Sequence, residues 1–200
     1  MAQINDPVLG GALAVELVSR AARVVQTHSD GSTVVKKLDG TYHTRLELVP
    51  STLTAGTVYW SMRNNGSKKA VVRQLAALIT FAGVAAATRS AYELVRFSGA
   101  NMTGGTSVAA VKGSNVDDTN TAVTDIRFAP AGLTTSGVTF ELNGIAILAH
   151  ANQLGSQHDA ILNFADTLVL EPGEGLAIRA STAIVAGSGI HGLVNWGERS

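Results

Sequence analysis

Residues 57–75, TVYWSMRNNGSKKAVVRQL, combine two aromatic side chains, a turn signal and a group of cations. Aromatic rings that stack on bases, next to cations that contact phosphates, are what single-stranded nucleic acid requires of a binding site. Tyr59 and Trp60 are consecutive, however, and consecutive side chains of a strand point to opposite faces. Asn65-Gly66 is typical of a tight β-hairpin turn, which would place Lys68 and Lys69 at a solvated tip. The stretch therefore predicts a β-hairpin and no nucleic-acid partner.

Metal binding has little support in the sequence. The five histidines are scattered, with none of the close pairs that zinc sites use. A trimer could still bring copies of one histidine together on its axis, as a metal or anion site that no monomer sequence reveals. NVDDTN, residues 115–120, offers oxygen ligands but lacks the loop length and the closing Glu of a calcium site. We interpret it as an acidic turn and predict no metal.

The evidence for a catalytic site in the sequence is equally weak. SQHDA brings Ser156, His158 and Asp159 together in sequence, but triad members meet in space, and no G-x-S-x-G elbow is present. GSGIHG, residues 187–192, is rich in glycine like a phosphate loop, yet it lacks the GK[ST] ending and a following helix. We therefore predict that the protein is not an enzyme, with no catalytic residue and no cofactor.

The composition indicates which elements carry these residues. Fifteen cations balance fifteen anions, and only 15% of residues are charged. Residues 1–73 carry nine cations against five anions, a net of +4, and the remainder has a net of −4. This asymmetry favours docking on an acidic neighbour, or packing between copies, but is too mild for DNA binding. No run approaches the roughly 20 apolar residues of a membrane span, so no membrane partner is expected.

Short alternating runs separated by glycine-rich turns follow residue 40, which predicts an all-β sandwich or barrel. Alternation places one side-chain set on a single face of a strand, Tyr42, Thr44, Leu46 and Leu48. A second set shares a face farther along, Arg73, Leu75, Ala77, Ile79 and Phe81. LEPGEGLAI indicates strand, turn and strand, with a core pair made of Leu168, Leu170, Leu176 and Ile178.

Residues 9–25, LGGALAVELVSRAARVV, fit two structures equally well. Leucine and alanine recur at near-helical spacing, whereas Glu16 and Arg23 each lie between apolar residues as in short strands. From residue 25 to residue 40 the sequence is polar and contains turn signals. We predict an N-terminal arm over residues 1–40, of helix or short strands, and a β-sandwich domain over residues 41–200.

The order of several segments resembles virion structural proteins of tailed bacteriophages. They are SMRN before a basic turn, ITFAGVAAATRSAYELVRFSGANMTGGT, VTDIRFAPAGLT, LVLEPGEGLAIR and GLVNWGER, preceded by ALAVELVSRAARVVQ. The resemblance implies a jelly-roll-like β-sandwich that forms a homotrimer and lies on the outer surface of the capsid. It implies a decoration or cement protein, whose partner is the major capsid protein.

An arm that lies along a capsid would use its cations against acidic surface. The candidates for capsid contact are Arg20, Arg23, Lys36 and Lys37. The alternative hypothesis is a receptor- or carbohydrate-binding module of a head fibre or tail. Such modules often hold sugars against exposed aromatic rings, and the two tryptophans both fall within expected strands.

Overall fold

The computed structural model describes residues 2–6, 11–16, 23–25, 40–81, 90–113, 121, 123–142, 144–151, 156–184 and 186–199. Every regular element in these ranges is a β-strand, which confirms the all-β prediction. No helix of the described part is long and apolar enough to cross a membrane. The chain divides into two compact units, Met1–Lys37 and Leu38–Ser200.

The first unit contains one three-stranded antiparallel sheet. Its strands are β1 (Ala2–Asp6), β2 (Gly11–Glu16) and β3 (Arg23–Val25), in that order. Two of these strands fall within residues 9–25, the segment for which helix and strand were both open. The described part of that segment is therefore extended.

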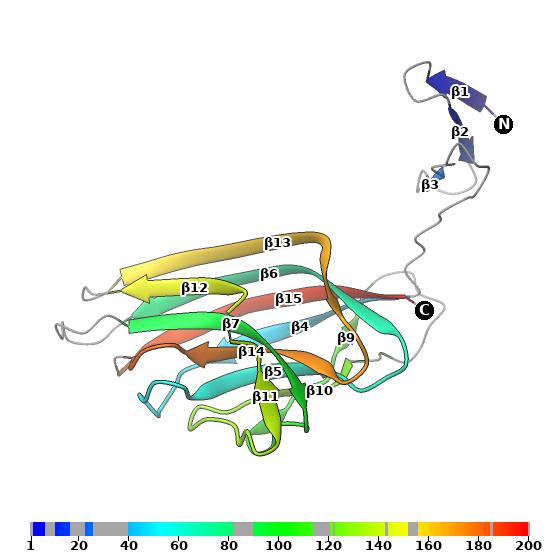
Figure 1. The fold of residues 1–200 in the computed structure, drawn as a ribbon. Coiled ribbons are helices and arrows are strands. Elements are labelled where there is room, and N and C mark those ends of the chain that lie inside the picture. The colour runs from blue at the N-terminus through cyan, green and yellow to red at the C-terminus, as the bar shows by residue number, and fades with distance from the viewer. Residues whose placement is uncertain are drawn as a thin grey trace. The chain divides into compact units, whose positions relative to one another are not determined.

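The second unit is a sandwich of two antiparallel sheets (Figure 1). The five-stranded sheet has the order β13 (Ser156–Leu170), β6 (Lys69–Phe81), β15 (Gly189–Arg199), β4 (Gly40–Leu48) and β9 (Val111–Lys112). The seven-stranded sheet has the order β11 (Val138–Phe140), β7 (Ser90–Gly99), β14 (Glu174–Ala180), β5 (Val58–Asn64), β10 (Val123–Phe128) and β8 (Thr106–Ser107), and β12 (Ala146–Ala151) also pairs with β7.

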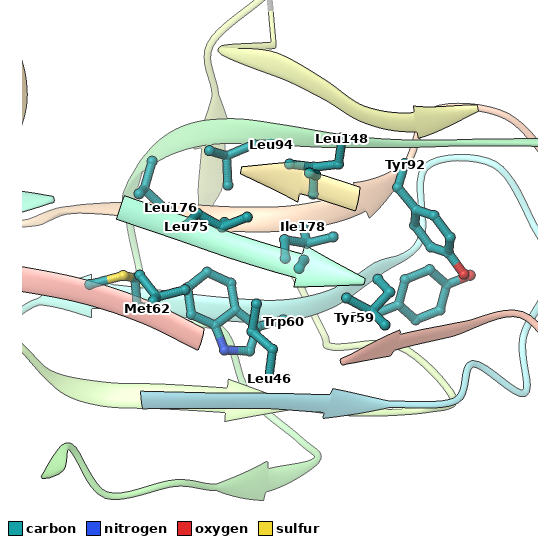
Figure 2. Packing of buried hydrophobic residues seen from close by; sticks show 14 of the residues in the cluster. Leu46, Tyr59, Trp60, Met62, Leu75, Tyr92, Leu94, Leu148, Leu176 and Ile178 are labelled. Carbon is teal, nitrogen blue, oxygen red and sulfur yellow. The ribbon is translucent and has the colours of Figure 1, made fainter. Parts of the chain in front are cut away.

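The main core fills the space between these two sheets. Figure 2 shows Leu46 and Leu75 of one sheet among side chains of the other, including Met62 and Leu176. Along β4 every second side chain is buried, as the period-two pattern predicted. The set Tyr42, Thr44, Leu46 and Leu48 is confirmed on the core face, each at most 4% exposed. Burial of this apolar surface is the main stabilising contribution to the fold.

The predicted hairpin at Asn65-Gly66 is wrong. β5 pairs with β10 and β14 in one sheet, whereas β6 pairs with β13 and β15 in the other. The four residues between them therefore carry the chain across the sandwich. The buried side chain of Asn64 holds this crossover, since its amide donates to the carbonyls of Lys68 (2.7 Å) and Leu170 (2.9 Å). Its oxygen accepts from the backbone N–H of Gly66 at 3.1 Å.

The turn between β13 and β14 is a second crossover of the same kind. The expected core set Leu168, Leu170, Leu176 and Ile178 is confirmed as buried, although its two halves come from opposite sheets. The face predicted for residues 73–81 is right except at its first member. Arg73 is exposed and Val72 is buried instead, because β15 and β13 both shift register opposite this part of β6. A bulge of this kind changes which residues face the core.

A smaller core covers the outer face of the seven-stranded sheet. It joins β-strand residues such as Val95 and Ala177 to Met102 and Leu133 of the connections between strands. Phe140 packs against this cluster, and the guanidinium of Arg179 lies 5.4 Å from the centre of its ring. The chain thus covers this outer face with its own loops.

Candidate interaction surface

The cations of residues 57–75 are mostly engaged within the fold. The Arg63 guanidinium donates to the side-chain oxygens of Asn65 and Asn101, and to the carbonyl of Gly99 at 2.6 Å. Lys69 forms an ion pair with Glu171 at 2.8 Å. These contacts tie together three connections at one end of the sandwich. They leave little of this charge for an acidic ligand.

The two aromatic residues of the same segment are buried in the core. Tyr59 and Trp60 belong to the same main core, which corrects the expectation that they point to opposite faces. The reason is a bulge in β5, because Ile178 pairs with Trp60 while the next residue of β14 already pairs with Val58. The Tyr59 hydroxyl donates to the carbonyl of Thr52 at 2.6 Å. Burial raises the pKa of Tyr59, and more strongly that of Tyr92, whose ring lies 6.2 Å away (Figure 2).

His158 and Asp159 of the triad-like motif do not converge. His158 and Asp159 are consecutive on β13, so their side chains point to opposite faces. His158 packs edge-on against the buried ring of Phe81, whereas Asp159 is exposed. GSGIHG contributes its last four residues to β15, a strand. Within the part of the chain that the structure describes, no three metal-ligating side chains gather.

The outer face of the five-stranded sheet differs from the outer face of the seven-stranded sheet, because apolar side chains on it are exposed to solvent. Strand register places Ile161, Ala76 and Leu193 side by side across β13, β6 and β15. Ile161 is 63% exposed, and Ala76 and Leu193 are half-buried. Leu78, 39% exposed, extends this aliphatic row on β6. An antiparallel sheet with one solvated face ordinarily carries polar residues there.

A row of polar side chains runs beside the aliphatic row. Register aligns Asn163, Gln74, Asn195 and His43 across four strands. The Gln74 amide donates to the Asn163 oxygen at 3.0 Å, and the Asn195 amide donates to the Gln74 oxygen at 3.2 Å. These bonds link the three amide side chains to one another. A partner would therefore meet ordered amide groups rather than mobile charges.

Charged side chains lie at the ends and margins of these rows: Arg45 follows Leu193 in register on β4, and Arg73 is exposed on β6 next to Gln74. Arg45 and Glu47 are exposed and form an ion pair with each other on β4. Asp159 and His191 flank Leu78 in the next row. We call the aliphatic row, the amide row and these margins the outer face. Interface centres are depleted in charged residues in the same way.

The edge of this sheet is formed by β13, its longest strand. β13 pairs with β6 on one side, and no strand of the described ranges pairs with its other side. The opposite end of the sheet is closed by β9, which has two residues. A long open edge exposes backbone donors and acceptors that can receive another strand.

The residues predicted for capsid contact cannot be placed on this surface. Arg20, Lys36 and Lys37 lie outside the described residues, and Arg23 begins β3 of the separate N-terminal unit. Sequence reasoning did not find the outer face. A signal was present in QHDAILN, residues 157–163, where Ile161 occupies the phase of Gln157, Asp159 and Asn163.

Among the described residues, these features define an antiparallel β-sandwich in which loops cover one outer face and apolar side chains of the other face are exposed. No protein-family model, curated protein or solved structure matches the chain.

Proposed function

We propose that this chain is a non-enzymatic decoration or cement protein on the outer surface of a tailed-phage capsid. In this role it bridges neighbouring subunits of the major capsid protein and stabilises the shell. The observation that carries the proposal is the outer face of the five-stranded sheet. It combines an exposed aliphatic row with ordered amides and with charges at its margins, as a surface that is covered in an assembly would.

The strand order supports the jelly-roll part of this proposal. Within the two sheets, β4-β15-β6-β13 faces β5-β14-β7-β12. Successive main strands alternate between the sheets except at β7 and β12, which is the order expected when two Greek keys fold into a jelly roll. Such a body is rigid, and in a repeating shell many weak contacts add through multivalency.

The alternative, a receptor- or carbohydrate-binding module, has less support. Trp60 and Trp196 are 2% and 1% exposed. The other eight aromatic side chains are also buried or half-buried, so none offers an open ring to a sugar. For this reason we place the structural role first.

Copy number in purified particles tests the proposed function. Quantitative mass spectrometry of the phage whose genome encodes this chain is expected to give about one copy for each major capsid protein, distributed by the symmetry of the shell. A few tens of copies or fewer would overturn the proposal and place the chain at a vertex, fibre or tail.

Binding to particles that lack the chain tests the surface. Leu78→Lys and Leu193→Lys are expected to weaken binding roughly tenfold or more, because a charge enters the centre of the contact. Leu142→Lys is the matched control, since Leu142 is 98% exposed and lies outside the five-stranded sheet. If all three variants bind like wild type, the outer face is not the capsid contact.

The predicted arm contact is tested separately. Replacing Arg20, Arg23, Lys36 and Lys37 by alanine removes four cations and is expected to weaken binding, more so at low salt, where exposed charges are least screened. Binding that keeps its strength and salt dependence would exclude these cations from the contact.

A further inference from the structure

The edge strands of the two sheets differ in length. The other edge strands of the described residues are shorter: β8 and β9 have two residues each, β11 has three, and β12, which pairs only with β7, has six. Short edge strands are a common protection against unwanted pairing. β13 is the exception, with 15 residues and a regular register against β6 from Ser156 to Asn163. Its only interruption is a bulge after Asn163, where Ala165 has a φ of 44°.

Side chains on the core face of β13 are incompletely covered. Leu162 and Phe164 pack against the main core but remain half-buried, whereas Leu75, paired with Leu162 on β6, is 1% exposed. Ile161 is 63% exposed on the opposite face of the same strand. Both faces of the edge strand therefore hold apolar surface that a further strand would cover.

The sequence of β13 complements itself in the antiparallel register centred on Ile161. A two-fold axis normal to the sheet must lie midway between the two copies of one residue, because only then do paired side chains share a face. With the axis at Ile161, the two copies of Ile161 meet on the outer face, and Asp159 faces Asn163 of the second copy. On the core face, Ala160 meets Leu162 of the second copy and His158 meets Phe164 of the second copy.

Two registers centred nearer the start of β13 give less favourable cross-strand pairs. An axis at Asp159 would oppose two carboxylates, which destabilises a cross-strand pair. An axis at Ala160 would set Asp159 against Ile161 of the second copy. The register at Ile161 avoids both conflicts and pairs the carboxylate with an amide donor.

We propose that the free edge of β13 binds a second copy of this chain, edge to edge and antiparallel about a two-fold axis at Ile161, so that the two five-stranded sheets become continuous. The contact is isologous, each copy giving the same strand. It does not depend on the proposed function. It is also distinct from a trimer contact, which joins two different surfaces around a three-fold axis.

Single cysteines test this register, because the chain contains none of its own. Directly opposed residues of an antiparallel pair lie about 4.5–5.5 Å apart at Cα, within the range of a disulfide. Under mild oxidation, Ile161→Cys is expected to give a disulfide-linked dimer on a non-reducing gel. Ile147→Cys is the matched control, since Ile147 is 58% exposed on β12 of the other sheet. It is expected to crosslink at least tenfold more slowly.

A mixture test reads the register directly. Asp159→Cys copies mixed with Asn163→Cys copies are expected to crosslink faster than either variant alone. Equal rates for Ile161→Cys and Ile147→Cys, or no preference in the mixture, would overturn the proposal. A crosslink from Ile161→Cys to a chain of different mass in purified particles would assign the edge to another occupant and overturn it too.

Association without a disulfide gives a second measurement. Ile161→Lys sets two cations against each other across the axis, so sedimentation is expected to show at least a tenfold weaker association than wild type. Ile147→Lys should leave it unchanged. The proposal fails if wild type and Ile161→Lys have the same mass across the concentration range, and circular dichroism of both variants shows whether the fold is kept.

Discussion

Glu198 is a buried carboxylate that links the two sheets of the sandwich. It lies on β15 with no exposed surface, and its Oε1 accepts from the Thr121 hydroxyl (2.5 Å) and from the Trp196 indole (3.3 Å). The backbone N–H of Val123, the first residue of β10, lies 3.4 Å from the same oxygen. One acceptor on the five-stranded sheet therefore fixes the start of a strand in the other.

We expect Glu198→Ala to lower the free energy of unfolding by about 2–4 kcal/mol. The Val123 N–H also bonds the Thr121 hydroxyl oxygen at 3.1 Å, and that hydroxyl has a second acceptor in the Val123 carbonyl at 3.4 Å. The Trp196 indole has no such substitute, and a buried donor without an acceptor costs about 1–3 kcal/mol. The lost methylene adds about 0.8 kcal/mol.

Urea unfolding followed by far-UV circular dichroism measures this change without relying on the fluorescence of the adjacent tryptophan. Glu198→Gln keeps an acceptor oxygen and is expected to lose only about 1 kcal/mol, because its bonds are no longer assisted by charge. Glu47→Ala removes an exposed carboxylate from β4 and should stay within about 0.5 kcal/mol of wild type. If Glu198→Ala is as stable as wild type, or Glu198→Gln is as damaging as Glu198→Ala, the assigned role of Oε1 is wrong.

Three further predictions address the crossover, a close backbone contact and a buried phenol. Asn64→Ala is expected to cost about 2–4 kcal/mol in urea unfolding, because one buried carbonyl, one partly buried carbonyl and one turn N–H lose their partner; Asn64→Asp, which keeps only the acceptor, should be nearly as costly. Gly175→Ala would set a Cβ 2.4 Å from the Phe97 ring and 2.5 Å from a backbone oxygen, so a lower melting temperature is expected, and an unchanged one would contradict this packing. Burial raises the pKa of Tyr92 above its ordinary value of about 10. The neutral Tyr92 side chain therefore contributes its full stability below about pH 10, and this contribution is lost as the pH rises further. Tyr92→Phe should flatten the fall in stability above about pH 10, and parallel curves of stability against pH for both proteins would refute this.

Much of the strand pattern could be predicted from local sequence. Alternation identified the core face of β4 because a strand with one solvated face must alternate. The same reasoning failed where the chain departs from period two. The bulge at Tyr59 and the register shifts opposite Arg73 each depend on the neighbouring strand, so the strand's own residues do not reveal them.

Pairing between strands was harder to predict than the strands themselves. Asn65-Gly66 has the composition of a hairpin turn, but in a sandwich a short connection can equally join opposite sheets. The deciding group is Asn64, whose side chain replaces the backbone bonds that a hairpin would make. An asparagine that ends a strand gives no such warning in sequence alone.

The candidate surface was hard to predict for the same reason, because the exposure of Ile161 depends on the order of the strands in the sheet. Had β13 lain inside the sheet, neighbours on both sides would have covered much of this side chain. The chain covers the outer face of the other sheet with its own loops, and its other described edge strands have two to six residues. Against this background an open 15-residue edge with isoleucine on its solvent side is a liability for a protein that stays alone. In a protein that works as part of an assembly, the same edge is a contact site, and it is there that self-pairing should be looked for first.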